Sequence, residues 1–377
     1  MLALAASARE WTDVSGRKME GRLLQHEAGE VTIKRAVDGR VVTFSTELLS
    51  AGDQDFLRTL RAPDQADASD GEEENFSGLE WPRRTRLSRD YRDYDVEVVR
   101  EDSAAGIYIY QTPNFEFKSD VKLARKVVRS FGKVFEGTLA AMQAFPLKWA
   151  PKVAGPRFRA RLFEHQADYL AGGGLPNSGG IYFAAKREIW LPLSSLGMRK
   201  TSSRYTFDGE GERSTLIHEI THQVHHEWLN RLPTWMTEGL AVYMESIPED
   251  DGEFSFDKQD IQGFVNSRDR GHDIRMMDPA RLMGMSAREW SANFAKNPTA
   301  LRRQYLSAFM LFHYFLHFDG RGDGKRIWAY VRAIEAGQPE AKARELLFDG
   351  RDNDQLIKAI TRAYRRERIK VKMGDED

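Results

Sequence analysis

The chain has 377 residues, with 56 Lys and Arg, 57 Asp and Glu, and no cysteine. The balanced charge predicts no attraction to nucleic acid, and no apolar run is long enough to predict a membrane span. The lack of cysteine excludes disulfides, thiolate metal sites and cysteine nucleophiles, so any metal ligands must be histidines and carboxylates.

The first eight residues are small and apolar, and Ala-Ser-Ala before Arg9 is similar to a signal-peptidase cleavage site. They have no basic leader, and the run is shorter than a working signal core. We therefore interpret residues 1–8 as the remnant of a signal peptide, which predicts an exported protein, periplasmic or extracellular. The alternative is an ordinary chain terminus on a cytoplasmic protein.

Residues 9–60 predict a small β domain. Met19–Gln25 and Val31–Arg35 are β-prone runs, and Asp38-Gly39 predicts a type I′ hairpin that leads into another strand. A closing helical turn is expected near residues 53–57.

This segment resembles the Sla-type homology domain, an SH3-like β-barrel. The resemblance implies an interaction module for a peptide or a cell-envelope ligand. A spacer that only packs is the alternative. The residues that carry the resemblance are Trp11-Thr12-Asp13, Ser15-Gly16, Gly29, Val31, Asp38-Gly39, Leu49-Ser50 and Asp53.

Residues 61–88 predict a linker between two domains. Asp and Glu are frequent between residues 64 and 74, among Ser, Gly and Pro, and this composition favours a flexible chain. A basic run follows, which we expect to be solvated or ion-paired with the acidic segment rather than bound to an anionic surface. Its members are Arg83, Arg84, Arg86, Arg89 and Arg92.

Residues 89–372 predict a second domain, so that the fold class of the chain is α+β. Its first half is expected to be a mixed sheet with a helix, and its second half mostly helical. The predicted strands lie at 96–99, 107–110, 157–163 and 180–193, and the predicted helices at 121–145, 301–318 and within 324–368.

His218, Glu219 and His222 form an H-E-x-x-H pattern inside an apolar-periodic run that predicts a helix. Four residues are little more than one helical turn, so the two imidazoles lie on the same face. Two neutral imidazoles at this spacing can hold one divalent ion, and the carboxylate of Glu219 then lies beside the ion without binding it.

A second helix is predicted to start at Pro233 or Thr234, because proline favours the first helical position. A short turn would make the two helices antiparallel neighbours and return Glu238 to the histidine pair. Gly239 would let the two backbones approach closely. Glu245, two turns further on, could orient one of the imidazoles.

The two motifs together resemble the gluzincin branch of zinc metallopeptidases. The segment from Pro233 to Val242, with its Pro-x-Trp-x-x-Glu-Gly-x-Ala pattern, is most similar to the bacterial "peptidase MA-like" families. The resemblance implies a zincin-like metallopeptidase domain with one Zn²⁺ per chain, held by His218, His222 and Glu238. It also implies Glu219 as the general base toward a metal-activated water.

The implied activity is hydrolysis of peptide bonds in a peptide or protein substrate by a secreted enzyme. In gluzincins an edge strand near the zinc pairs with the substrate backbone, and the run at 180–193 is our candidate for that strand. The Gly-x-Met-x-Asn motif of aminopeptidase N relatives is absent from the sequence. We therefore favour an endopeptidase over an aminopeptidase.

Tyr305, near the start of the helix predicted at 301–318, is a second candidate catalytic residue. In the peptidase MA-like families a Tyr at a comparable position faces the metal, and the resemblance implies that its phenol donates to the oxyanion. Tyr243 and Tyr314 are rival candidates for this role.

Four further histidines are not assigned to the site. His225 and His226 could reach the helix face near the metal, but adjacent histidines on a helix are expected at the surface. His313 and His317 have apolar neighbours and no Glu in the catalytic position, so they are expected in the core or at an interface.

Two other functions remain open at this point. One is a catalytically inactive, metal-binding scaffold in which the β domain does the binding. Glu219 argues against it, because a structural zinc site normally has four protein ligands and no use for an adjacent carboxylate. The other is a zinc amidase that acts on a cell-wall peptide crosslink with the same chemistry.

Overall fold

The computed structural model describes residues 9–27, 30–60, 76–87, 94–150, 156–176, 178–201, 204–207, 213–268, 274–292 and 297–374. The expected signal-peptide remnant at residues 1–8 lies outside these ranges. The chain divides into two compact units, Met1–Phe76 with Tyr330–Ala343, and Ser77–Ala329 with Arg344–Asp377. Each unit is described by itself.

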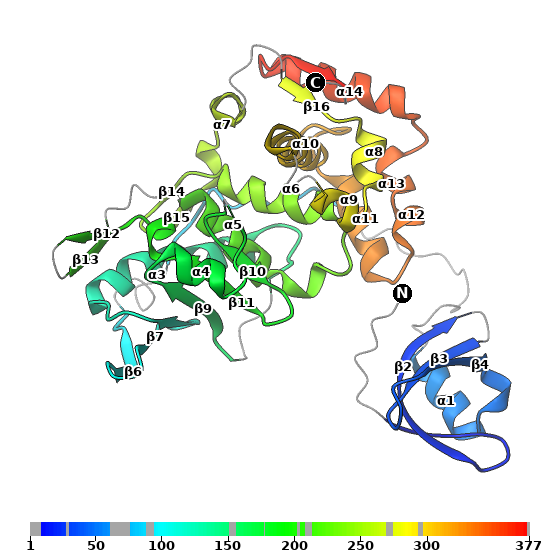
Figure 1. Ribbon diagram of the computed structural model, residues 1–377. Helices are drawn as coiled ribbons and strands as arrows, with labels where there is room; N and C mark the ends of the chain where they lie inside the picture. The colour runs from blue at the N-terminus through cyan, green and yellow to red at the C-terminus, as the bar shows by residue number, and fades with distance from the viewer. Residues whose placement is uncertain are drawn as a thin grey trace. The chain divides into compact units, whose positions relative to one another are not determined.

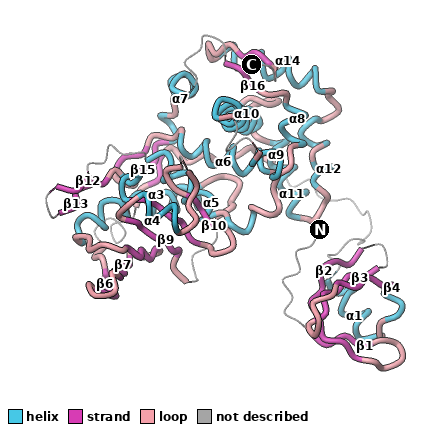
Figure 2. Tube along the Cα trace, in the orientation of Figure 1, coloured by secondary structure: helices cyan, strands magenta, loops and turns pink. Residues whose placement is uncertain are grey.

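The N-terminal residues form an antiparallel sheet of four strands in the order β1-β2-β3-β4, followed by a helix (Figures 1 and 2). Trp11, Val31 and Ile33 are buried in one core with Leu49 and Leu57. Val31 and Ile33 face this core together because alternate residues of a strand point to the same side. The elements are β1 (Arg9–Thr12), β2 (Lys18–Glu27), β3 (Glu30–Arg35), β4 (Val41–Ser45), η1 (Thr46–Leu48) and α1 (Ala51–Leu60).

This sheet is not closed into a barrel, so the barrel expected from the sequence is corrected to an open sheet. Closure requires the two edge strands to pair along their length. In the described part of the chain β1 and β4 do not pair with each other. An isolated bridge between Asp13 and Leu49 joins the chain just beyond these two strands.

The hairpin predicted at Asp38-Gly39 forms, but its turn is not of type I′. The N–H of Gly39 donates to the carbonyl of Arg35 at 3.1 Å. Gly39 has a φ of +68°, whereas Asp38 is outside the positive-φ region. A type I′ turn requires positive φ at both central residues, so the loop is longer than predicted.

The second unit contains a six-stranded mixed sheet in the order β10-β11-β9-β8-β7-β6. Strand β9 pairs parallel with β8 and β11, and the other pairs are antiparallel. Strand β8 was not predicted from the sequence. The strands are β6 (Glu97–Asp102), β7 (Ile107–Gln111), β8 (Phe115–Ser119), β9 (Phe158–Phe163), β10 (Ile181–Phe183) and β11 (Glu188–Pro192).

The predicted helix at 121–145 is α3 (Arg125–Ala144), which packs its apolar face on the sheet. Phe131 and Phe135 meet Phe117 of β8 edge to face, with ring centroids 5.0 and 4.9 Å apart. The helix also packs against α5 (Arg213–Val224), the helix of the H-E-x-x-H pattern. Helix α5 also packs directly against β10 and β11, so both the sheet and α3 hold the helix of the H-E-x-x-H pattern in place.

The run at 180–193 is two strands rather than one. Residues 184–187 form a turn between β10 and β11, and Arg187 in this turn has a φ of +51°. Strand β11 lies inside the sheet between β10 and β9, so of these two strands only β10 is at an edge of the sheet. Strand β10 packs next to α5.

The linker predicted at 61–88 divides at its middle. Residues 61–75 lie outside the described ranges, whereas the second unit begins at Ser77. Trp81 packs against Tyr243 and His317, with ring centroids 5.9 and 4.6 Å away. This part of the expected linker is therefore a packed segment.

In the described part of the basic run, Arg83, Arg84 and Arg86 are ion-paired with a distant part of the chain rather than with the preceding acidic segment. Arg89 and Arg92 lie outside the described residues. Strand β5 (Arg84–Thr85) pairs with β15 (Glu253–Ser255), which in turn pairs with β14 (Glu249–Asp250). Arg86 Nε lies 2.9 Å from Glu253 Oε2, and Arg83 Nη2 lies 3.3 Å from Asp257 Oδ2.

The C-terminal half is mostly helical, and the whole chain is α+β as expected (Figure 1). The predicted helix at 301–318 is α10 (Pro298–His317), which starts earlier than expected because Asn297 caps it. The remaining elements are α4 (Gln166–Ala171), η2 (Leu193–Leu196), β12 (Met198–Thr201), β13 (Arg204–Phe207), η3 (His226–Trp228), α6 (Thr234–Glu245), η4 (Phe256–Lys258), α7 (Ile261–Arg268), β16 (Ile274–Met276), α8 (Pro279–Gly284), α9 (Ala287–Ser291), α11 (Lys325–Glu335), α12 (Glu340–Ala343), α13 (Glu345–Phe348), α14 (Asn353–Arg366) and β17 (Val371–Met373).

Among the described residues, no helix combines the length and the apolar character needed to cross a membrane.

Candidate metal centre

The site is formed where α5 and α6 pack side by side. Helix α5 ends at Val224, and the 3₁₀ turn η3 and a short connection lead to Pro233, the N-cap of α6. Proline has no N–H to leave unsatisfied at this end, which is why the second helix starts where the sequence predicts. His218 meets Glu238 and Glu245 of α6, and His222 meets Glu238, so the two helices run antiparallel.

Gly239 does not lie between α5 and α6, which corrects the prediction. A Cβ at this position would lie 2.7 Å from the carbonyl oxygen of Ala308 and 2.9 Å from Cβ of Phe312. Both residues belong to α10. The missing side chain therefore lets α6 approach α10, and this contact turns the opposite side of α6, with Glu238, toward the histidines.

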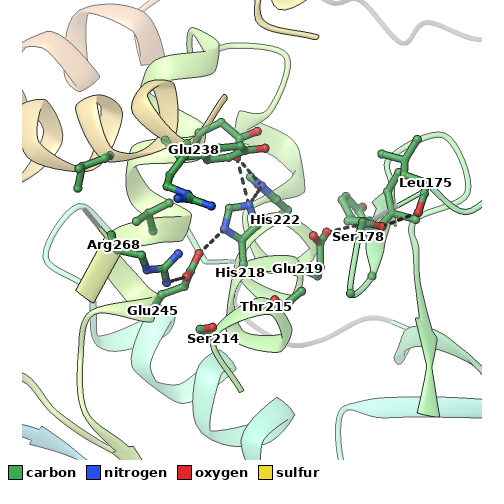
Figure 3. Close-up of a pocket in the computed structure, with 18 residues that line it drawn as sticks. Leu175, Ser178, Ser214, Thr215, His218, Glu219, His222, Glu238, Glu245 and Arg268 are labelled. Atoms are coloured by element: carbon green, nitrogen blue, oxygen red, sulfur yellow. Dashed lines mark hydrogen bonds and ion pairs between the residues drawn. The ribbon is translucent and has the colours of Figure 1, made fainter. Parts of the chain in front are cut away.

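Three ligand-type atoms of His218, His222 and Glu238 converge at one point (Figure 3). The two Nε2 atoms are 3.0 Å apart, and Oε2 of Glu238 lies 3.2 Å from His218 Nε2 and 3.3 Å from His222 Nε2. All three side chains are close to buried, with exposed fractions of 12%, 12% and 16%. The sequence prediction that these residues meet is confirmed.

The group fits a divalent ion such as zinc. Ligands about 2.0–2.1 Å from a tetrahedral ion are separated by about 3.3 Å, which is close to the three observed distances. The Oε2 atom of Glu238 is buried, and no described group satisfies it with a well-formed hydrogen bond. A buried carboxylate oxygen without such a partner is costly unless a cation is bound to it.

The Nδ1 atom of His218 lies 2.6 Å from Oε1 of Glu245, which is 5% exposed. A carboxylate accepts a hydrogen bond at this contact, so Nδ1 carries the hydrogen, and in the neutral imidazole Nε2 presents its lone pair to the centre. Arg268 is paired with the other oxygen of Glu245 (Figure 3). The expectation that Glu245 orients an imidazole is confirmed for His218.

His222 has no comparable support in the described part of the chain, where its buried Nδ1 atom lacks a hydrogen-bond partner. His225, one turn further along, is fully buried, so its expected surface position is wrong. Its Nδ1 bonds the carbonyl of Thr221, and burial, helped by the charge of His222, lowers the pKa of His225 to about 3. His226 instead bonds the Tyr182 hydroxyl through Nδ1 at 2.8 Å.

The electrostatics favour a positive charge at the centre. Burial alone would lower the pKa of His218, but the carboxylates of Glu238 and Glu245 outweigh it and raise the pKa well above its ordinary value. Burial alone would raise the pKa of Glu238, yet the imidazoles of His222 and His218 hold it below its ordinary value. The positive charge can be supplied by protons or by a metal ion.

Glu219 lies on the same helix but faces away from Glu238, toward the segment with Leu175 and Ser178 (Figure 3). Its Oε2 accepts a hydrogen bond from the backbone N–H of Tyr182 in the edge strand β10, at 2.7 Å. Burial raises the pKa of Glu219, although the neighbouring imidazoles oppose the rise. The structure thus separates this carboxylate from the ligand group and fixes it by a contact that the sequence did not predict.

A cavity of about 420 Å³ opens beside the centre. It is lined by Gly180 and Tyr182 from the edge-strand side and by Tyr305 of α10, among others. The expected substrate strand therefore borders the cavity through β10. The outer N–H of Tyr182 is already bonded to Glu219, so a pairing partner would have to use the other groups of this strand.

Tyr305 is the one of the three candidate tyrosines that reaches the centre. Its ring lies 5.8 Å from the ring of His218, although it sits two turns inside α10 rather than at the start. The hydroxyl of Tyr243 instead meets Nε2 of His317 at 2.8 Å, and that of Tyr314 donates to Asp319 at 2.9 Å. His313 is buried in the core, as expected.

Sequence reasoning missed Tyr182 as the partner of Glu219, and it missed the two arginines Arg268 and Arg302 that line the cavity. Arg268 lies at the end of α7, far from the motif in the sequence, and no local pattern marks it. Helix α7 packs against α10, and the tertiary fold brings Arg268 to Glu245.

Comparison with models of known protein families and with curated proteins found no match to this chain. The resemblance to gluzincins therefore rests on the residues quoted above.

Proposed function

We propose that this protein is a zinc-dependent peptidase of the gluzincin type. The observation that carries the proposal is the convergence of two Nε2 atoms and one carboxylate oxygen within 3.0–3.3 Å, next to a buried carboxylate that faces away from Glu238. Three ligands leave a coordination position open, which is typical of catalytic rather than structural zinc.

His218, His222 and Glu238 would hold the metal, and Glu245 with Arg268 would keep the first imidazole in its binding orientation. A zinc ion held there supplies Lewis acidity and lowers the pKa of a bound water. We assign one ion per chain.

Glu219 acts as the general base in this proposal. It takes a proton from the attacking water and later transfers it to the leaving amine of the cleaved peptide bond. The N–H of Tyr182 holds one of its oxygens, which leaves the other oxygen for the proton. Tyr305 lines the same cavity, and its phenol is proposed to donate to the oxyanion.

The substrate is proposed to be a peptide or protein that pairs with β10 along the cavity, in the manner of an endopeptidase. The second unit would then have a zincin-like fold. The open N-terminal sheet is proposed to be a divergent SH3-like module that binds a peptide or a cell-envelope ligand, in an exported protein.

Metal analysis and hydrolysis of a peptide library, with and without a chelator, test the proposal. We expect about one zinc per chain in wild type and a sharp loss of zinc in His218→Ala and Glu238→Ala. Glu219→Gln is the matched control, because it keeps size and removes no ligand. It should retain zinc and lose about 10²- to 10⁴-fold of the hydrolysis rate, the share of a positioned acid–base group.

Three results would contradict the proposal. Unchanged zinc content in both ligand variants would refute the ligand assignment. Zinc-loaded wild type that cleaves no library peptide would favour the inactive scaffold, and cleavage confined to a cell-wall crosslink would favour the amidase.

A further inference from the structure

A second cavity, of about 510 Å³, adjoins the cavity of the metal centre. The two share Arg268, Arg302 and Leu306 in their walls, so they are direct neighbours. The second cavity also contains Arg275 and Arg303. We call it the arginine cavity, defined by these four arginines.

The charge of the arginine cavity is one-sided. Its described lining consists of the four guanidinium groups with an amide, a hydroxyl and an apolar side chain, and it includes no carboxylate. Like charges gathered in a hollow with low-dielectric walls focus the field and raise the local concentration of anions. The net charge of the whole chain is close to zero, but positive charge is concentrated beside the proposed catalytic centre.

The arginines are not equivalent. Arg268 is held by Glu245, and its guanidinium lies 4.9 Å above the ring of Phe264. Its position is therefore set by the protein, and it belongs to the support of His218. Arg302 is exposed and has no ion pair with a described carboxylate, and it is in the walls of both cavities. Arg302 is the group best placed to bind a ligand that spans the two.

We propose that the arginine cavity is a subsite that binds a carboxylate of the peptide substrate, either on an acidic side chain or at the C-terminus. This proposal rests on the proposed peptidase function, because it takes the ligand to be the substrate. Guanidinium groups pair with carboxylates through two parallel hydrogen bonds, which adds geometric selectivity to the charge attraction. The subsite would select substrates by charge and fix their position relative to Glu219.

Binding can be tested without hydrolysis. The probes are N-acetylated peptides of one sequence that carry either Glu or Gln at a single scanned position, and either a free or an amidated C-terminus. Each is titrated by calorimetry into the full chain that is zinc-loaded and carries Glu219→Gln. We expect one acid form to bind at least tenfold more tightly than its neutral isostere. The comparison of Glu with Gln peptides tests an acidic side chain, and the comparison of free with amidated peptides tests the C-terminus. Together they show which carboxylate is bound.

Adding Arg302→Gln should abolish this preference, and Arg302→Glu should reverse it toward a Lys-containing peptide. Arg288→Gln is the matched control, because Arg288 is an exposed arginine on α9 outside both cavities. It should keep the full preference. Equal affinities for the acid and neutral peptides, or a preference that survives Arg302→Gln, would overturn the proposal.

Hydrolysis by the active chain separates this proposal from the proposed function. If the acid peptides bind preferentially but no peptide is cleaved, the anion subsite stands and the peptidase function falls. If peptides are cleaved with the same kcat/KM for acid and neutral forms, the peptidase function stands and the subsite falls.

Discussion

Two carboxylates on one helix have different tasks at the metal centre. Glu238 and Glu245 are seven residues apart on α6, two turns on the same face, and both point at α5. Glu238 reaches both Nε2 atoms, whereas Glu245 reaches only Nδ1 of His218 and is shared with Arg268. Glu238 thus belongs to the proposed ligand group, and Glu245 holds His218 in place.

Loss of Glu245 should weaken metal binding without removing a ligand. In Glu245→Gln the acceptor for His218 Nδ1 is retained but its charge is lost, so His218 becomes a weaker donor at Nε2. We expect zinc affinity to fall about 10- to 100-fold, and further in Glu245→Ala. Competition with a chelator of known affinity measures the change.

The control for this prediction is Glu227→Gln, which changes a carboxylate that is 66% exposed and paired with Arg187 at the surface. Its zinc affinity should match wild type. Wild-type affinity in Glu245→Ala would show that the contact with His218 does not support the metal.

At the scale of elements, the site depends on α6 being held between α5 and α10. Gly239 allows the approach to α10, and Glu238, its neighbour in the chain, faces the other way. Below the helices, β10 contributes the N–H that holds Glu219. Each functional carboxylate therefore depends on a different neighbouring element for its position.

Gly239→Ala should destabilise the protein, although alanine favours a helix by about 1 kcal/mol over glycine. The new Cβ would lie 2.7 Å from the Ala308 carbonyl oxygen, a backbone atom that cannot move alone. We expect a net loss of about 1–3 kcal/mol in the free energy of unfolding, measured by denaturant titration.

Gly284→Ala is the matched control, because a Cβ there would have its nearest contact at 3.5 Å, an ordinary separation. It should leave stability unchanged or raise it slightly. If Gly239→Ala behaves in the same way, the close packing of α6 on α10 is not required.

At the scale of the second unit, two buried histidines connect its stability to pH. His313 and His317 lie on α10, and their rings are 4.7 Å apart. The hydroxyl of Tyr364 donates to the carbonyl of Met310, so it accepts a hydrogen from Nδ1 of His313. Tyr243 bonds the Nε2 atom of His317. Both imidazoles are thus held in hydrogen bonds among aromatic neighbours that carry no charge.

Burial lowers the pKa of His317 from 6.5 to about 4, and it lowers the pKa of His313 well below 6.5, helped by the charge of His317. At these two histidines the unfolded chain therefore binds more protons than the folded chain below pH 6.5. The stability that they contribute is complete above pH 6.5 and is lost as the pH falls toward 4, by an amount on the order of 3 kcal/mol for His317.

Urea unfolding between pH 8 and pH 4.5 tests this prediction. Relative to wild type, His317→Gln should lose less stability over this range, because its side chain does not titrate. His165→Gln is the control, since it changes an imidazole that is 67% exposed. If His317→Gln has the same slope as wild type, the acid sensitivity arises elsewhere.

The sequence alone was sufficient to predict that His218, His222 and Glu238 meet. The spacing of His218 and His222 places both rings on one face of any α-helix, and the short connection to Thr234 requires the second helix to fold back. These are local consequences of helix geometry, so they did not depend on the rest of the fold. For the same reason the periodic helices α3 and α10 and the strands β6, β7 and β9 were predicted close to their positions.

Contacts between residues far apart in the chain were decided by the tertiary structure. The partner of Gly239, the N–H of Tyr182 that holds Glu219, the open edge of the N-terminal sheet and the ion pairs of Arg83 and Arg86 all join distant segments. The same holds for the arginine cavity, which collects side chains from α7, β16 and α10. No local pattern marks such positions, because the energy that selects them comes from packing and burial that exist only after the chain has folded.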